Sequence, residues 1–327
     1  MKKLFTPILI VYWMLGNLSA QQAPQYSLYA FNAYAFNPAC AGLDNSLVFT
    51  GVYRKQWSNL EGAPETQHLN VHLPLYVIRS GIGLRVENDV IGAHRVTQVV
   101  GSYNYQMELG RNALLSMGVS GGYLLYVLDG AKLRAPDGTY AEPGGVFSHN
   151  DQYLPEGNIQ AGAAVGEAGI YFQSLRFEAG AAVQPVFAPV LKGDGDGNFS
   201  LKPERHYIFT AAYRLNVGDN LELRPSMLAK TDAKETQIEI STYMRWRENI
   251  FAGASYRGFG SSSRDAAILF AGMKINEKTT LGYAFDLPLS PLKAANRGSH
   301  ELLLRYNLGR PIGAGKLPPI IYNPRFF

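Results

Sequence analysis

The sequence predicts an all-β protein, a transmembrane antiparallel β-barrel of about 14 strands with an irregular N-terminal segment and a short periplasmic C-terminal tail. Three observations predict this fold: few charges with much tyrosine and glycine, apolar side chains at every second residue, and connections that are long only at alternate positions. Only 17% of the residues are charged, against roughly 25% in soluble domains. The mean hydropathy of −0.09 excludes a helical membrane bundle, which needs several runs of about 20 apolar residues.

Residues 1–20 predict a signal peptide for export. Lys2 and Lys3 supply its positive start, residues 4–15 are mostly apolar, and residues 17–20 offer a cleavage site after Ala20. Leu18 is larger than the residue preferred at its place in such a site. The rest of the sequence contains no apolar run long enough to cross a bilayer as a helix. We therefore expect an exported protein that enters a membrane only as strands.

Charge and cysteine usage narrow the function classes. The formal net charge of +4 includes two lysines of the predicted signal peptide, so the mature chain is close to neutral. This small charge excludes nucleic-acid binding as the main activity. Cys40 is the single cysteine, which excludes an internal disulfide and a cysteine-based metal cluster.

Residues 21–45 are predicted to form an irregular segment, either a plug or a periplasmic segment of the barrel. Asn37-Pro38 is a turn signal. The segment is too apolar for a solvated linker because it carries the aromatic residues Tyr26, Tyr29, Phe31, Tyr34 and Phe36. We expect it to be ordered against the barrel.

Residues 46–308 show the alternation of β-strands and are assigned to the outer-membrane β-barrel. In 236–246, Ile238, Ile240 and Met244 alternate with Gln237 and Glu239. Successive side chains of a strand point to opposite faces, so each strand has one apolar and one polar face. The number of strands is even, as in bacterial barrels. Turn signals place the strands at 46–55, 65–73, 80–89, 94–107, 113–128, 158–170, 176–186, 204–216, 221–231, 235–245, 250–258, 264–275, 280–288 and 298–308.

The connections between these strands provide an independent test. The first, fifth, seventh and thirteenth are long, at 56–64, 129–157, 187–203 and 289–297. All are odd-numbered, so all open on one side, and the even-numbered connections are short. Long loops outside and short turns in the periplasm are typical of outer-membrane barrels. A water-soluble β-sandwich or propeller is the alternative, but a sandwich has no reason to sort its loops, and blade-length repeats are not visible.

The polar faces predict a barrel interior filled by paired charges of both signs. The charged residues on these faces are Arg85, Glu87, Asp89, Glu108, Glu239 and Arg245. Ile240 falls on the lipid face. A charge introduced at Ile240 is therefore expected to destabilise the barrel more than a charge reversal at Glu239.

Three patterns could carry chemistry. Residues 118–122 match the hydrolase pattern G-x-S-x-G, but inside a predicted strand, where we expect the glycines to relieve crowding. His68 and His72 share a strand face about 13 Å apart, too far to share a metal. A loop resembles the start of a calcium site but lacks glycine at the sixth position and glutamate at the twelfth; this weak calcium candidate comprises Asp194, Asp196 and Asn198. With no catalytic constellation, we expect no enzyme and no cofactor.

The barrel is predicted to close before residues 309–327, because several glycines and prolines there break any strand. With an even strand count, this tail lies in the periplasm. Its apolar end allows two interpretations, recognition by the barrel-insertion machinery or docking to the barrel rim or a partner. The candidate partner-binding residues are Tyr322, Arg325, Phe326 and Phe327.

Several stretches resemble the PorP/SprF family of Bacteroidetes. Residues 25–42 resemble its opening pattern, Q-F-S-Q-Y, then N, then N-P-A-Y-A-G, with Leu28 and Cys40 as departures. Residues 53–57 and 62–67 resemble Y-R-x-Q-W followed by G-A-P-x-T-Q. Residues 299–301 and 323–327 are also similar to family sequences. The resemblance covers both ends and the overall length.

This resemblance implies a non-enzymatic outer-membrane component of a type IX secretion system. Such a protein supports export or surface attachment of cargo such as adhesins, and in some members gliding motility. The implied partners are type IX secretion components including periplasmic ring lipoproteins, secreted adhesins or other cargo, and outer-membrane lipid. The alternative is a passive outer-membrane channel for small or apolar molecules. An open lumen would favour the channel, whereas an assembly component can be plugged.

Overall fold

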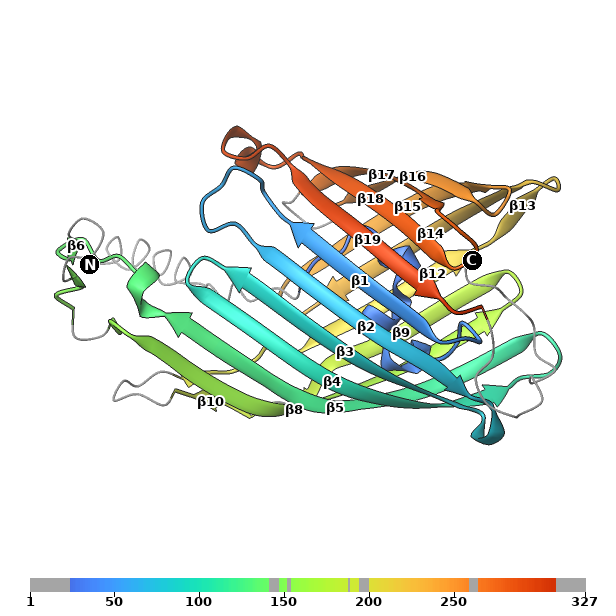
Figure 1. Cartoon of the computed structure of the whole chain (residues 1–327), viewed down its shortest axis with the longest axis horizontal. Helices are drawn as coiled ribbons and strands as arrows, with labels where there is room; N and C mark the ends of the chain where they lie inside the picture. The colour runs from blue at the N-terminus through green and yellow to red at the C-terminus, as the bar shows by residue number, and fades with distance from the viewer. Residues whose placement is uncertain are drawn as a thin grey trace, which may run out of the picture.

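The computed structural model of the protein describes residues 24–140, 147–151, 154–187, 189–193, 200–258 and 264–309. Within these residues an antiparallel sheet curls into a closed barrel of long, tilted strands (Figure 1), which confirms the predicted fold class. The predicted signal peptide and the tail after Gly309 lie outside the described residues.

The wall has 14 strands, because the short β13 continues β12 along the same neighbour, β14. The predicted spans differ from the observed ones by four residues at most, at the end of β8. The wall strands are β1 (Val48–Lys55), β2 (Glu65–Leu75), β3 (Ser80–Ile91), β4 (His94–Glu108), β5 (Ala113–Asp129), β8 (Asn158–Ser174), β9 (Phe177–Phe187), β12 (His206–Tyr213) with β13 (Leu215–Val217), β14 (Leu221–Thr231), β15 (Thr236–Trp246), β16 (Ile250–Arg257), β17 (Ala266–Lys274), β18 (Thr279–Pro288) and β19 (Ser299–Asn307).

Neighbours in sequence are neighbours in space around the whole barrel. The ring closes where β1 pairs with β19, from Val48 opposite Asn307 to Lys55 opposite His300. Closure removes the unpaired sheet edges, as a lipid environment requires.

The two ends of the barrel differ as the loop lengths predict. We call the end that carries the connections 56–64, 130–157, 188–205 and 289–298 the long-loop end, and the opposite end the short-turn end. Small elements decorate these connections: η5 (Gly130–Lys132), β6 (Thr139–Tyr140), β7 (Phe147–Ser148), β10 (Leu191–Lys192), β11 (Ser200–Leu201) and η6 (Pro291–Ala294) at the long-loop end, and η4 (Tyr76–Ile78) at the short-turn end. Long loops lie outside the cell in outer-membrane barrels, so we expect the short-turn end to face the periplasm.

The side-chain facing also follows the sequence pattern. Ile240 is 47% exposed on the outer surface, whereas its neighbour Glu239 is 2% exposed inside. Likewise Leu69 faces outward and His68 is buried. The alternation therefore separates a lipid face from a lumen face, as predicted.

The N-terminal segment, which we define as residues 24–45, lies inside the barrel (dark blue in Figure 1). It contains three 3-10 helices, η1 (Tyr29–Phe31), η2 (Ala33–Ala35) and η3 (Pro38–Cys40). Asn37 begins the third by accepting a hydrogen bond from the Ala39 backbone N–H, and Pro38 suits the first helical position. In the described chain, all helices are such short turns, and none could span a membrane.

The N-terminal segment runs from the long-loop end to the short-turn end. At its start, Lys230 near the end of β14 donates a hydrogen bond to the Pro24 carbonyl. At its end, Tyr76 in η4 donates one to the Asn45 carbonyl. The chain thus passes through the lumen to the short-turn end before it begins β1.

Candidate functional site

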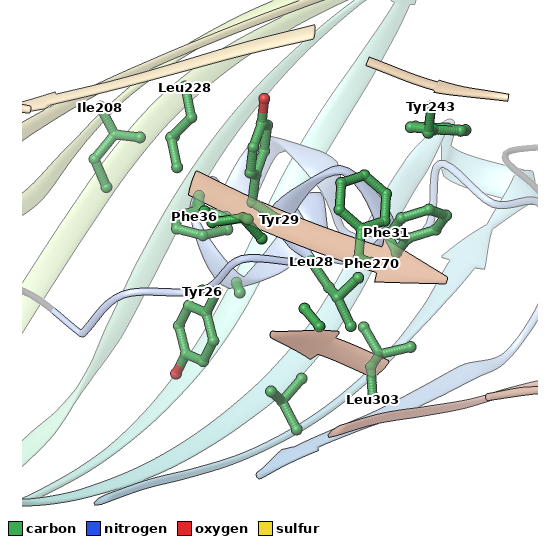
Figure 2. Close-up of a cluster of buried hydrophobic side chains, with 14 of the residues drawn as sticks. Tyr26, Leu28, Tyr29, Phe31, Phe36, Ile208, Leu228, Tyr243, Phe270 and Leu303 are labelled. Carbon is green, nitrogen blue, oxygen red and sulfur yellow. The ribbon is translucent and has the colours of Figure 1, made fainter. Parts of the chain in front are cut away.

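The N-terminal segment fills the lumen with an apolar cluster that touches strands on several sides of the barrel. Tyr26, Leu28, Tyr29, Phe31 and Phe36 come from the segment, and each is at most 5% exposed. Figure 2 shows them packed against wall residues Ile208, Leu228, Tyr243, Phe270 and Leu303. The Phe31 ring lies 4.3 Å from the Phe251 ring, centroid to centroid. Burial of this much aromatic surface stabilises the segment in place.

A polar anchor holds the start of the segment. Arg54 in β1 donates to Asp286 in β18 at 2.7 Å and to Glu301 in β19 at 3.1 Å. Glu301 accepts in turn from the backbone N–H groups of Ser27 and Leu28, at 2.6 and 2.9 Å. Glu301 therefore links the wall to the backbone of the segment through charge-assisted hydrogen bonds.

The middle of the segment is held by β3 and β9. Arg85 in β3 donates to the Ala35 carbonyl at 2.9 Å and forms an ion pair with Glu167 in β8. Gln184 in β9 donates to the Phe36 carbonyl at 2.9 Å. The carbonyl groups of an irregular backbone need such donors when they are buried.

The last part of the segment fits against wall positions without large side chains. Ser116 in β5 donates to the Ala39 carbonyl at 2.7 Å, and Asn104 in β4 donates to the Ala41 carbonyl at 2.6 Å. A Cβ atom at Gly118 would come within 2.4 Å of the Ala39 nitrogen. The glycine therefore allows the segment to lie directly on the strand.

A second charged anchor lies where the segment joins β1. Asp44 contacts Arg305 of β19 at 2.8 Å and His72 of β2 at 3.4 Å. Arg305 also donates to the Phe31 carbonyl at 2.7 Å. The end of the segment is thus tied to the two strands that flank β1.

Above the segment, at the long-loop end, lies a cavity of about 300 Å³ that we call the vestibule. Gln25, Trp57 and Lys230 are among its lining residues, together with acidic side chains of the surrounding loops. One of these acids is Asp232. The backbone N–H of Glu235, with that of Lys234, lowers the pKa of the Asp232 carboxyl, so this carboxylate stays ionised at neutral pH.

The hydrolase-like stretch and the two histidines singled out in the sequence have structural roles in the barrel wall. Ser120 of the G-x-S-x-G stretch lies inside β5 and shares a hydrogen bond with Ser102, so the stretch is part of the wall. His68 pairs with Glu87 at 3.1 Å, while His72 contacts Asp44. Among the described residues, no group of three His, Cys, Asp or Glu side chains could hold a metal ion.

Several of the predicted lumen charges form pairs of opposite sign. Glu239 pairs with Arg257 at 2.7 Å and Arg245 with Glu222 at 2.6 Å. Asp89 is buried and accepts a hydrogen bond from Thr66 at 2.6 Å. Glu108 ends β4 and is half-buried. The calcium candidates Asp194, Asp196 and Asn198 and the tail candidates Tyr322, Arg325, Phe326 and Phe327 lie outside the described residues.

Sequence reasoning missed the anchor made by Arg54, Asp286 and Glu301. The family resemblance could have pointed to this anchor, because Ser27, Arg54 and Glu301 each belong to a stretch that carries the resemblance. These stretches are far apart in the chain, and their meeting point appears only in the folded barrel.

Together, these features define an outer-membrane β-barrel whose lumen is occupied by its own N-terminal segment. The chain belongs to the PorP/SprF family, described as type IX secretion system membrane proteins, whose model matches residues 18–306. It is thus an outer-membrane member of a family of secretion components, and this membership suggests a non-enzymatic role.

The solved structures to which the chain is similar include hydrocarbon transporters and porins. The toluene transporter TbuX of Ralstonia pickettii has a TM-score of 0.50 and 11% identity, with 84% of this chain and 92% of that chain covered. The CymD monoaromatic hydrocarbon channel has a TM-score of 0.48 and 10% identity, over 84% and 91% of the two chains. At such identities the likeness concerns the fold alone. No curated protein matches the chain significantly in sequence.

Proposed function

We propose that this protein is a non-enzymatic component of a type IX secretion system that supports export or surface attachment of cargo such as an adhesin. The observation that carries this proposal is the occupied lumen. The N-terminal segment is buried along most of its length and bonded to β1, β3, β4, β5, β9 and β19. A barrel with such a segment in its lumen is suited to hold partners at its two ends rather than to conduct.

A passive channel for small or apolar molecules is the second candidate. The similarity to the TbuX transporter fold favours it. Against it stand the aromatic cluster and the two charged anchors, which a diffusing molecule would have to displace together. Displacing the start of the segment alone would leave the buried Glu301 carboxylate without the Ser27 and Leu28 N–H donors.

Conductance separates these two functions. The purified full-length mature protein, inserted into planar lipid bilayers, should show no steady conductance when compared with an open porin at the same protein amount. Steady conductance of the unmodified protein, or its selective permeability to toluene in loaded vesicles, would contradict the assembly proposal and support the channel.

The partners of the proposed function can be sought in native membranes. Affinity purification of the tagged protein after mild cross-linking should enrich a secreted surface protein and a periplasmic lipoprotein of the secretion machine. The same tag on an unrelated outer-membrane barrel is the control. Enrichment of neither protein over this control would contradict the proposal.

We propose in addition that the C-terminal tail docks to the barrel rim or to a partner of the secretion machine, through Tyr322, Arg325, Phe326 and Phe327. The proposal is supported by the place where the tail begins, since β19 ends at Asn307 at the short-turn end. Recognition by the barrel-insertion machinery is the alternative. Deletion of 318–327 should leave insertion intact and abolish partner capture, whereas loss of the protein from the outer membrane would support the alternative.

A further inference from the structure

The vestibule contains a buried lysine whose hydrogen-bonding capacity is only partly used. Lys230 is 8% exposed, and its Nζ donates one hydrogen bond, to the Pro24 carbonyl at 3.0 Å. Among the described residues, no carboxylate forms an ion pair with it. A lysine amino group has at least two N–H donors, so at least one is available to an oxygen atom that enters the cavity.

The neighbouring acids are already engaged. Asp286 contacts Arg54 at 2.7 Å and Arg257 at 3.0 Å, and Arg257 also pairs with Glu239. Asp265 accepts a hydrogen bond from Gln237 at 2.9 Å. Among the described residues, neither Asp286 nor Asp265 forms an ion pair with Lys230, so its amino group keeps donor capacity.

One wall of the vestibule is aromatic. Trp57 lies in the loop after β1 and is half-buried, and its backbone N–H donates to the Ser299 hydroxyl at 3.1 Å. This hydrogen bond holds the loop that contributes Trp57 to the lining of the cavity. A flat apolar ring at the edge of a polar cavity is suited to pack against the apolar face of a ligand.

The charges of the lining decide which class of ligand fits. The basic residues of the lining are Arg54, His206, Lys230 and Arg257, and the acids are Asp232, Glu235, Asp265 and Asp286. Because basic and acidic residues are equal in number, the lining does not favour a ligand of either charge. An uncharged ligand with many hydroxyl groups can donate to the acids and accept from the Lys230 amino group at the same time.

We propose that the vestibule binds a neutral sugar residue, with the ring packed on Trp57 and a hydroxyl oxygen accepting from Lys230. The cavity of about 300 Å³ lies at the lower end of the volumes of small-molecule sites, which suits one sugar ring. The vestibule lies at the long-loop end, so the sugar is presented from outside the cell. This binding does not depend on the proposed role in secretion.

Tryptophan fluorescence of the full mature protein tests the proposal. The sequence has three tryptophans; Trp13 lies in the predicted signal peptide and Trp246 at the short-turn end. The protein is held in a detergent without a sugar headgroup, and the probes are glucose, N-acetylglucosamine and glucuronate. We expect a saturable change in emission with at least one neutral sugar, retained in Trp246→Phe, and an affinity about tenfold or more lower in Lys230→Met.

Three outcomes would overturn the proposal: no saturable response to either neutral sugar, an unchanged affinity in Lys230→Met, or glucuronate bound more tightly than both neutral sugars. If Lys230→Met does not fold, Trp57→Ala tests the same cavity by calorimetry, because Trp57 lies in a loop outside the strands. Sugar binding by Trp57→Ala with the affinity of the unmodified protein would likewise overturn it.

Discussion

At the scale of single residues, Arg54 links three parts of the chain. It is 1% exposed and contacts Asp286, Glu301 and the Ser27 hydroxyl. In Arg54→Met the buried Glu301 carboxylate loses its counter-ion, and we expect the free energy of unfolding to fall by about 3–5 kcal/mol. Urea unfolding in detergent measures this. Lys55→Met changes the exposed neighbouring residue, and it should change the free energy of unfolding by less than about 0.5 kcal/mol. Equal losses of stability in the two variants would contradict the role of Arg54 as an anchor.

Ile240 and Glu239 test the facing of a strand. Ile240→Arg places a charge on the lipid face and should destabilise by about 2–4 kcal/mol if it lies near mid-membrane. The sequence-based expectation that Glu239→Arg is milder needs correction, because Glu239 is buried and paired with Arg257 at 2.7 Å. An arginine there would face Arg257 directly. Ile240→Val is therefore the control. If Ile240→Arg unfolds at the same urea concentration as Ile240→Val, Ile240 does not face the lipid.

At the scale of elements, β5 determines how the N-terminal segment is seated. Gly118 faces the lumen, and a Cβ there would come within 2.4 Å of the Ala39 nitrogen, whereas a Cβ at Gly121 on the outer face would meet nothing within 4 Å. We expect Gly118→Val to displace the segment and to speed protease cleavage within 24–45. Gly121→Ala should be cleaved as slowly as the unmodified protein. Equal cleavage rates in both variants would show that the segment does not depend on this contact.

At the scale of the whole molecule, the direction of the N-terminal segment determines the topology. The described chain begins at the long-loop end, next to Lys230, and its last strand ends at the short-turn end. An epitope tag placed directly before Pro24 should therefore be detected by antibody on intact cells. A tag at the C-terminus should be detected only after the outer membrane is permeabilised. Detection of the C-terminal tag on intact cells would show that the short-turn end faces outward and would contradict the expected orientation.

The strands and their facing could be predicted from the sequence alone. Alternation in 236–246 correctly placed Ile240 outside and Glu239 inside, and the odd-numbered long loops correctly indicated a barrel with two unlike ends. These features are encoded locally, because the pleat of a strand sends successive side chains to opposite faces whatever the rest of the chain does.

The path of the N-terminal segment was decided only by the tertiary structure. Its aromatic residues predicted that it would be ordered, but Ser27 meets Glu301 across 274 residues, and the lysine that bonds to Pro24 lies in β14. These partners become neighbours only when the barrel closes, because closure pairs β1 with β19, which in turn pairs with β18. Local sequence encodes no such long-range pairing, because an irregular backbone takes its hydrogen bonds from whichever buried groups surround it.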